Sequence, residues 1–288
     1  QTCALPILSI LAVSLLALVA CTPEKKQEAD YSQYVNPMIG TDFTGNTYPG
    51  AQVPFGMVQL SPDNGLPGWD RISGYFYPDT TIAGFSHTHL SGTGAGDLYD
   101  ISFMPVTRPY KEAPAPLGIY STFSHNDEAA SAGYYRVLLK DYNINVELTA
   151  TERCGIQRYT FPEAEASVFL NLKKAMNWDF TLDSKIEVVD STTIRGYRLS
   201  QGWSPLQHVY FETRFSKPFV ACHMDTTSIV TKEKGWIGTA YVARFDFNTK
   251  KDEEILVTTG ISGVSMEGAG KNLRAEAPKD DFDYYQAQ

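Results

Sequence analysis

Short apolar runs separated by turn residues constrain the fold of this chain more than any other feature of its sequence. Between residues 31 and 262, β-like runs are broken by Gly, Pro, Asn or Asp roughly every 8 to 12 residues, a spacing typical of antiparallel sandwiches. In residues 144–149 apolar side chains alternate with Asn, Glu and Thr, and residues 135–139 alternate in the same way. The gaps between runs hold no crossover helix of the length that a parallel βαβ unit needs. We therefore predict an all-β fold, one large antiparallel β-sandwich. Further strands are predicted at 154–161, 167–172, 193–199, 208–215, 236–245 and 254–262.

Composition agrees with this fold and narrows the classes of partner. A chain of 288 residues with 43% hydrophobic residues can bury the core of one large domain, and 17 Tyr and 15 Phe favour strands. The net charge of −9 gives no attraction to phosphate backbones, so we expect no nucleic-acid partner. Neutral partners such as sugars are compatible with this charge.

The first 33 residues are typical of a targeting segment followed by a tether. The apolar run 4–20 carries no charge and is slightly shorter than the roughly 20 residues of a membrane span. It ends in Leu-Val-Ala-Cys, which resembles the bacterial lipoprotein box. We therefore predict a signal peptide over 1–20, lipidation at Cys21 and a polar tether over 21–33, with an ordinary secretory signal or a membrane anchor as alternatives. This predicts a protein of the bacterial cell envelope, lipid-anchored in the periplasm or on the outer surface. Because the chain opens with Gln and no basic segment precedes the run, we expect the natural N-terminus to lie further upstream.

The other end of the chain predicts short helices. Residues 265–277 begin with Ser265, a residue type favoured at helix N-termini, and continue with helix formers, and a second helix could follow Pro278. We interpret 265–288 as a linker beyond which the natural protein is expected to continue. Of the remaining cysteines, Cys154 and Cys222 could pair, but we favour two buried free thiols.

Residues 36–100 are rich in Gly, Pro, aromatic residues, His and Asp, which is typical of a functional loop system. His87 and His89 are two residues apart, so on an extended strand both imidazoles would point to the same side. They could bind substrate, or bind a metal with Asp97 or Asp100, or be polar side chains satisfied within tight loop packing. The glycine-rich segment 92–97 precedes an apolar run, 98–106, that we predict to be a strand rather than the helix of a nucleotide site.

Trp69 and Asp70 indicate a sugar site. A tryptophan ring can cover the C–H face of a pyranose while a neighbouring carboxylate accepts its hydroxyl protons, and the alternative is that Trp69 fills the core. A glycosidase needs a pair of carboxyl groups, but the available aspartates have no apolar setting that would raise a pKa, so we do not expect a complete pair in this chain. The aspartates in question are Asp63, Asp70, Asp79, Asp97 and Asp100.

Four longer strings are more specific than these single features. They are YVNPMIGTDFTGNTYPGAQVPFGMVQLSPD from Tyr34, PGWDRISGYFYPD from Pro67, IAGFSHTHLSGTGAGDLYDISFMP from Ile82 and ISGVSMEGAGKNLRAEAP from Ile261. Together they resemble the N-terminal domain of glycoside hydrolase family 92, in order over residues 34–283. The resemblance implies a supersandwich of the galactose mutarotase type over 34–264, followed by the linker 265–288 and an (α/α)6 barrel outside this sequence.

The resemblance also implies a function. Members of that family are calcium-dependent, inverting, exo-acting α-mannosidases that release mannose from glycans through α-1,2 and other linkages. Their catalytic acid and base belong to the barrel, so this chain alone is expected to be inactive, and the calcium ligands are expected mostly outside it. The implied substrate-binding residues are those in matching motifs, namely Phe43, Asn46, Trp69, Asp70, His87 and His89. Phe76 departs from the pattern, because relatives often carry His there. The alternative function is a stand-alone glycan-binding surface lipoprotein.

Overall fold

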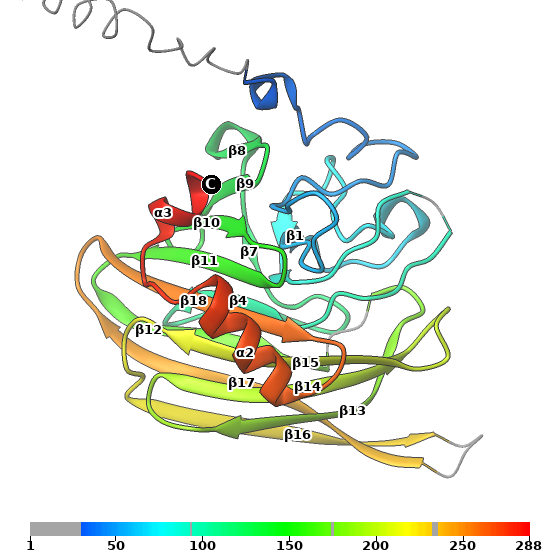
Figure 1. The fold of residues 1–288 in the computed structure, drawn as a ribbon, viewed down its shortest axis with the longest axis vertical. Helices are drawn as coiled ribbons and strands as arrows, with labels where there is room; N and C mark the ends of the chain where they lie inside the picture. The colour runs from blue at the N-terminus through cyan, green and yellow to red at the C-terminus, as the bar shows by residue number, and fades with distance from the viewer. Residues whose placement is uncertain (1–29, 93, 174–175, 232–235) are drawn as a thin grey trace, which may run out of the picture. The chain divides into compact units, whose positions relative to one another are not determined.

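Two antiparallel sheets form the body of residues 34–288, and Figure 1 shows them stacked with their strands running in similar directions. The computed structural model describes residues 30–92, 94–173, 176–231 and 236–288. Residues 1–33 and 34–288 are separate units. In the described part of the first unit, the Asp30 carboxylate accepts hydrogen bonds from Ser32. The predicted signal peptide, Cys21 and nearly all of the tether lie outside the described residues.

The first sheet has six strands, and the second has eight. In spatial order the six are β1 (Ser61–Asp63), β3 (Gly84–Ser86), β4 (Ser102–Thr107), β12 (Ala164–Asn171), β17 (Trp236–Thr249) and β16 (Ala221–Thr231). The eight are β13 (Phe180–Val188), β14 (Thr193–Gln201), β15 (Gln207–Phe215), β18 (Glu253–Ser262), β11 (Cys154–Phe161), β10 (Ile144–Ala150), β9 (Tyr134–Leu139) and β8 (Glu128–Ser131). Two small ribbons pair β2 (Thr81–Ile82) with β7 (Ser121–Thr122), and β5 (Glu112–Ala113) with β6 (Gly118–Ile119). Single 3-10 turns are η1 (Ser32–Tyr34), η2 (Trp69–Arg71) and η3 (His125–Asp127).

Aromatic side chains fill the space between the two sheets. Phe103 on β4 meets Phe215 on β15 edge to face at 6.4 Å, and Phe215 also packs on Phe245 and Phe247 of β17. Strands alternate as the sequence predicted: successive residues of β14 switch regularly between buried and half-exposed. The predicted all-β antiparallel sandwich is confirmed.

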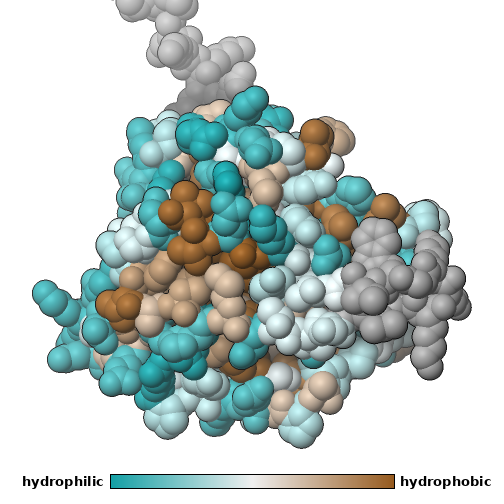
Figure 2. All heavy atoms as spheres, turned by 90° about the horizontal axis from the view of Figure 1, so that it is seen from below, coloured by the Kyte–Doolittle hydropathy of each residue, from teal (hydrophilic) through white to brown (hydrophobic). Residues whose placement is uncertain are grey.

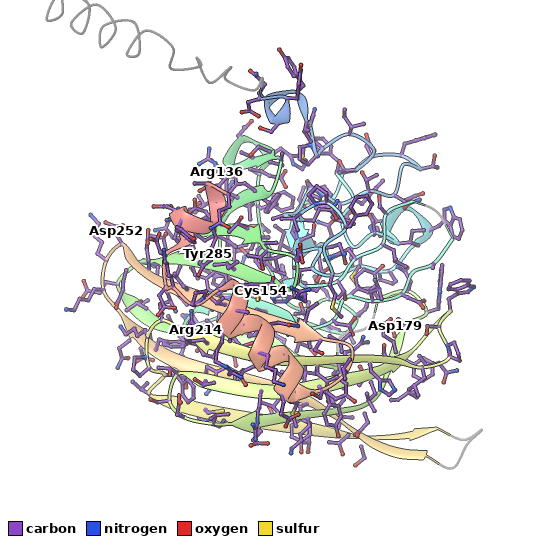
Figure 3. The ribbon with its side chains drawn as sticks, in the orientation of Figure 1. Arg136, Cys154, Asp179, Arg214, Asp252 and Tyr285 are labelled. Atoms are coloured by element: carbon purple, nitrogen blue, oxygen red, sulfur yellow. The ribbon has the colours of Figure 1, made fainter. Side chains whose placement is uncertain are left out.

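The two C-terminal helices cover the outer face of the eight-stranded sheet. Helix α2 (Met266–Glu276) begins after Ser265, whose hydroxyl accepts a hydrogen bond from the Gly268 N–H at 3.0 Å. Helix α2 lies across β18 and β15 (Figure 1), and α3 (Phe282–Gln286) follows it. A second apolar cluster joins both helices to the sheet, and in Figure 3 Cys154, Arg214 and Tyr285 are labelled around it. The predicted helical segment at the C-terminus is therefore present.

One strand prediction needs correction, and several strands were not predicted, of which β13 and β16 are the longest. The run 98–106 is a strand only from Ser102, because Leu98, Tyr99 and Ile101 have φ of 86°, 65° and 54°, values that a strand does not allow. Strands β13 and β16 were not predicted. Both are edge strands, which are protected by polar residues and so lack the clean apolar alternation of central strands.

Candidate functional site

His87 is a buried, neutral side chain in the described structure. Its Nδ1 lies 2.8 Å from the carbonyl oxygen of Ile101, and its Nε2 is buried without a hydrogen-bond partner. Burial lowers the pKa of His87 to about 4. The ring fits only because residue 155 is Gly, since a Cβ there would stand 2.5 Å from the imidazole. A sugar therefore cannot reach this ring without movement of the residues around it.

His89 is also buried, and both of its ring nitrogens face oxygen atoms. Nδ1 lies 2.7 Å from the carbonyl oxygen of Gln59, and Nε2 lies 2.9 Å from Oδ1 of Asp63. Ser86 Oγ is 3.1 Å from the same Nε2. The two histidines thus have separate partners among the described residues. His89 has the geometry of a polar group satisfied in tight packing, whereas Nε2 of His87 lacks a partner there. Their predicted contact with sugar stays a prediction.

Trp69, in contrast, is exposed. Its accessible fraction is 55%, and its ring stacks on Trp178 with the centroids 6.3 Å apart and the planes 30° from parallel. The alternative that Trp69 fills the core is therefore wrong. The carboxylate of neighbouring Asp70 accepts no hydrogen bond from the described residues, whereas Arg71 pairs with Asp79 at 2.6 Å between Nε and Oδ2. Trp69 and Asp70 thus present an apolar face and an acceptor side by side.

Phe43 and Asn46, from the same predicted set, differ in exposure. Phe43 is 80% exposed, while Asn46 is buried with its Oδ1 lacking a partner among the described residues. The Asn46 carbonyl accepts a hydrogen bond from the Gly92 N–H at 2.7 Å, which joins this loop to the glycine-rich segment. Phe76, which departs from the family pattern, lies under the Arg71 guanidinium, with 4.7 Å between the guanidinium carbon and the ring centroid. Its ring therefore stabilises the Arg71–Asp79 pair.

Sequence analysis missed two further tryptophans, Trp178, which contacts Trp69, and Trp203, whose segment is joined to Asp97. Asn177 Oδ1 accepts a hydrogen bond from the Gly68 N–H at 2.8 Å, which fixes Trp178 beside Trp69. The backbone N–H of Trp203 donates to Oδ1 of Asp97 at 3.0 Å. Trp203 is 80% exposed. The adjacent Gly96 packs on Asn177, where a Cβ would stand 2.7 Å from the side chain. We call Trp69, Trp178 and Trp203 the tryptophan wall. One sequence signal could have revealed them. Of the 4 Trp in the chain, these two stand between polar or loop-forming residues, in Asn-Trp-Asp and Gly-Trp-Ser.

A buried ionic network holds these segments together. The guanidinium of Arg198 donates from Nη1 to Asp100 at 2.6 Å and to Asp179 at 3.1 Å. Asp179 also accepts from the Leu98 N–H, and its Oδ1 is buried without a partner among the described residues. Burial raises the pKa of Asp179 to about 6, with the Arg198 charge opposing the rise. Figure 3 shows Asp179 at one end of the strands, opposite Asp252.

These contacts bear on catalysis and on metal binding. Asp63, Asp97 and Asp100 already accept hydrogen bonds from protein groups, so they form part of the scaffold. Within the described ranges, no group of three or more His, Cys, Asp or Glu side chains could hold a metal ion.

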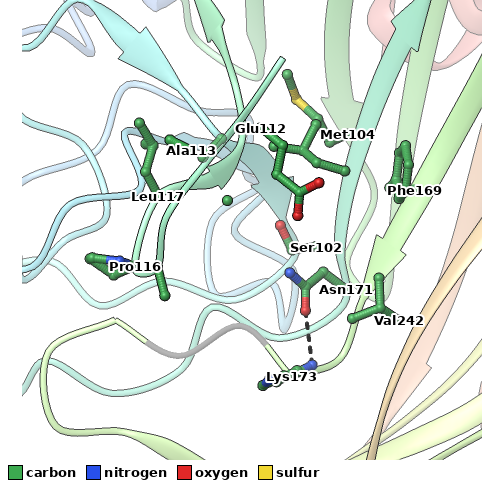
Figure 4. A pocket seen from close by; sticks show the side chains of 14 residues that line it. Ser102, Met104, Glu112, Ala113, Pro116, Leu117, Phe169, Asn171, Lys173 and Val242 are labelled. Carbon is green, nitrogen blue, oxygen red and sulfur yellow. Dashed lines mark hydrogen bonds between the residues drawn. The ribbon is translucent and has the colours of Figure 1, made fainter. Parts of the chain in front are cut away.

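A cavity of about 420 Å³ lies elsewhere, beside the β5–β6 ribbon, and none of the six predicted site residues lines it (Figure 4).

Exposed apolar surface is unevenly distributed on the molecule: on the face in Figure 2, hydrophobic residues form patches between hydrophilic ones. No helix among the described residues is long and apolar enough to cross a membrane. Cys154 and Cys222 are both free thiols, as favoured from the sequence, but only Cys154 is buried as predicted, since Cys222 is partly exposed.

Comparison with known proteins places this sandwich among the glycoside hydrolases. The model of the glycosyl hydrolase family 92 N-terminal domain matches residues 34–262, and the chain belongs to this family. It is similar to a family GH92 α-mannosidase of Bacteroides thetaiotaomicron, solved with mannoimidazole, at 37% identity and a TM-score of 0.80 over 89% of this chain and 35% of that one.

Two more distant relatives agree with this assignment. A GH92 inverting mannosidase of Bacteroides thetaiotaomicron VPI-5482 is 26% identical, with a TM-score of 0.74 over 91% of this chain and 35% of that one. A protein described as an uncharacterized secreted glycosidase of Arthroderma benhamiae is 27% identical over 161 residues, 52% of this chain and 20% of that one. The chain thus spans about a third of the length of these solved relatives, at 35% of each.

Proposed function

We propose that this chain is the active-site-wall domain of an inverting, exo-acting α-mannosidase of the α-1,2 type, which releases mannose from glycans. In this proposal residues 34–264 are the N-terminal sandwich, and residues 265–288 lead to a catalytic (α/α)6 barrel outside the sequence. The tryptophan wall carries the proposal, because three exposed indole rings on one set of loops have no role in the core. Sugar rings present C–H faces that such rings can cover.

The predicted site residues divide into two roles within this proposal. Phe43, Trp69 and Asp70 lie at the surface and contact the sugar. Asn46, His87 and His89 are buried and act as positioning residues. Asn46 joins its loop to the glycine-rich segment, and the two histidines bond the backbone of Ile101 and Gln59. That the family relative was solved with mannoimidazole supports a mannose-type ligand.

The general acid and base belong, in this proposal, to the part of the enzyme beyond this chain. The observation in support is that, in the described structure, no two neighbouring candidate aspartates are both without a protein partner. An inverting mechanism needs two carboxyl groups separated by about 6.5 to 9.5 Å, with water between base and sugar. Calcium, if used, would be bound by that same outside part.

For location, we propose a lipid anchor at Cys21 in the bacterial cell envelope. The support is the sequence pattern before Cys21, and a relative described as a secreted glycosidase is consistent with export.

A stand-alone glycan-binding lipoprotein is the second candidate. A preformed pocket around Trp69 would favour it, but the cavity in the described structure is lined by other residues. An open aromatic face instead favours a wall completed by another domain.

The test is hydrolysis of α-1,2-mannobiose by the chain alone and by the chain joined to the catalytic region that the proposal places after it. We expect release of mannose only from the joined enzyme. Trp69→Ala should lower kcat/KM of the joined enzyme roughly 10- to 100-fold, from lost ring contact, while Trp69→Phe should retain most of it. Hydrolysis by the chain alone, or full activity of Trp69→Ala, would overturn the proposal.

A further inference from the structure

The cavity beside the β5–β6 ribbon lies on the outer face of the six-stranded sheet. Phe103 points from β4 toward the other sheet, so its neighbours Ser102 and Met104 point the opposite way. Asn171 pairs with Ser102 across the strands, and Phe169 pairs with Met104, which places all four side chains on one face. The ribbon β5–β6 with its connecting residues covers this face and closes a cavity of about 420 Å³.

Two polar groups in this cavity have no partner among the described residues. Ser102 is 2% exposed, and its hydroxyl makes no hydrogen bond to a described residue. Glu112, from the ribbon, likewise accepts none. Figure 4 shows the Glu112 carboxylate and the Ser102 hydroxyl turned into the same space, while Asn171 Oδ1 is bonded to the Lys173 N–H at 3.0 Å. The Ser102 hydroxyl therefore faces the cavity space, where a ligand or water can satisfy it.

The rest of the lining sets the chemistry of what would fit. Phe169, Met104 and Leu117 supply apolar surface on both sides of these polar groups. The opposite charges of Glu112 and Lys173 both line the space, so neither an anion nor a cation has a clear advantage. A neutral molecule with C–H surface and several hydroxyls matches all of these features. The volume is near the lower end of the roughly 300 to 1,000 Å³ of small-molecule clefts, which suits one or two rings.

We propose that this cavity is a second, non-catalytic binding site for a neutral pyranose of one or two rings. Ligand hydroxyls donate to the Glu112 carboxylate and exchange a hydrogen bond with Ser102, and the C–H faces lie against Phe169 and Met104. The inference does not rest on the proposed function, because none of the tryptophan wall lines the cavity.

The experiment uses the full chain with 13C-labelled methionine methyl groups. Met104 lines the cavity, whereas Met57, which is 39% exposed, does not and serves as the internal control. On titration with methyl α-D-mannopyranoside we expect a saturable shift of the Met104 methyl signal, with a Kd on the order of millimolar. The Met57 signal should not move.

Matched variants assign the binding to this cavity. Glu112→Gln should weaken binding about 10-fold, and Ser102→Val about 3-fold, because each removes a hydrogen-bonding group. Glu163→Gln, the same change at an exposed position outside the cavity, should leave the Kd unchanged. If Ser102→Val does not fold, Glu112→Gln on the exposed ribbon still decides the question.

Further control measurements distinguish binding in this cavity from the other possible results. Trp69→Ala should leave the Met104 titration unchanged, so failure of the mannosidase proposal would not affect this result. Sodium glucuronate should bind much more weakly, since its charge meets Glu112. No saturable Met104 shift, an unchanged Kd in Glu112→Gln, or equally tight binding of cyclohexanol, which has a single hydroxyl, would overturn the proposal.

Discussion

Arg198 is a fully buried cation whose two carboxylate partners come from different segments of the chain. Asp100 follows the glycine-rich loop, and Asp179 precedes β13. Removing one member of a buried ion network leaves the others uncompensated, which costs about 3–5 kcal/mol. We therefore expect Arg198→Met to lower the free energy of unfolding by that amount in urea titrations.

Arg195 provides the control for this prediction. It lies three residues earlier on β14, and its partner Glu187 is also partly exposed. Because exposed pairs contribute little, Arg195→Met should cost less than about 1 kcal/mol. Similar losses for the two variants would mean that the buried network does not stabilise the loops.

Asp179 gives a pH dependence with a defined sign. Its folded pKa of about 6 lies above the value of 3.8 for an unperturbed carboxyl, so the folded state binds the proton more tightly. This contribution to stability is present below about pH 4 and is lost as the pH rises through 6, up to roughly 2–3 kcal/mol. We expect wild type to lose about that much more free energy of unfolding than Asp179→Asn between pH 4 and pH 7.

His87 must be considered in the same measurement, because it titrates in an overlapping window with the opposite sign. Its folded pKa of about 4 lies below 6.5, so its contribution is present above pH 6.5 and is lost as the pH falls. It is common to wild type and Asp179→Asn, and therefore cancels in their difference. Identical pH profiles for the two proteins would contradict the assignment to Asp179.

The two thiols should differ in reactivity. Burial raises the pKa of Cys154 to about 12 and packs it under the C-terminal helices, whereas Cys222 on the edge strand β16 is only partly buried. In the native protein we expect iodoacetamide to modify Cys222 first and Cys154 only after unfolding, since the thiolate is the reactive form. Mass spectrometry of peptides at successive times measures this order. Equal rates would show that Cys154 is accessible.

For single residues, the sequence predicted the chemical role of a side chain better than it predicted whether that side chain is exposed. The Gly-Trp-Asp motif predicted an exposed sugar-binding ring, and Trp69 is exposed. The spacing of the two histidines could not reveal that His89 is enclosed by Gln59 and Asp63. Nor could it reveal that His87 is held by the Ile101 carbonyl. Trp203 was missed for the same reason, because its backbone is fixed by Asp97, more than a hundred residues earlier.

Elements with local signals were predicted well, and those shaped by their position in a sheet were not. Strand β11 has the predicted bounds, since it is a central strand and ends directly before Pro162. The edge strands β13 and β16 carry polar residues that hide the pattern, and β13 also has a register shift between Thr181 and Asp183. The left-handed residues before β4 have no sequence signal, because they are Leu, Tyr and Ile rather than Gly.

The start of α2 offers a test at the scale of a single element. The Ser265 hydroxyl accepts the Gly268 N–H, so Ser265→Ala should lower the free energy of unfolding by about 1 kcal/mol. Ser265→Asp keeps an acceptor at the same place and should cost little. Urea titration of both variants distinguishes loss of the cap from a general effect of substitution, which would lower both equally.

At the scale of the whole molecule, the family motifs indicated the sandwich, but the cavity could not have been predicted. Its walls come from positions as far apart as Ala83 and Val242, which only the folded sheet brings together. The motifs report on loops where function is expected, whereas the ribbon that covers the cavity, residues 112–119, lies in none of the four strings, although Ser102 and Met104 of the lining do. A sequence pattern therefore locates the predicted sugar-binding loops and is silent on the second face.

The hydrophobic core predicts which part of the chain folds on its own. The main core cluster runs from Ala51 to Ile261 and joins both sheets, and among the described residues it includes none before Tyr34. Deleting residues 1–33 should therefore change the free energy of unfolding by less than about 0.5 kcal/mol. Deleting residues 1–60 also removes Ala51, Val58 and Leu60, which are fully buried, and with them several kcal/mol of a total stability of only about 5–15 kcal/mol. We expect the shorter deletion to unfold cooperatively in urea like the full chain, and the longer one to lose its cooperative transition. A loss of cooperativity already on deleting residues 1–33 would mean that the first segment contributes to the core.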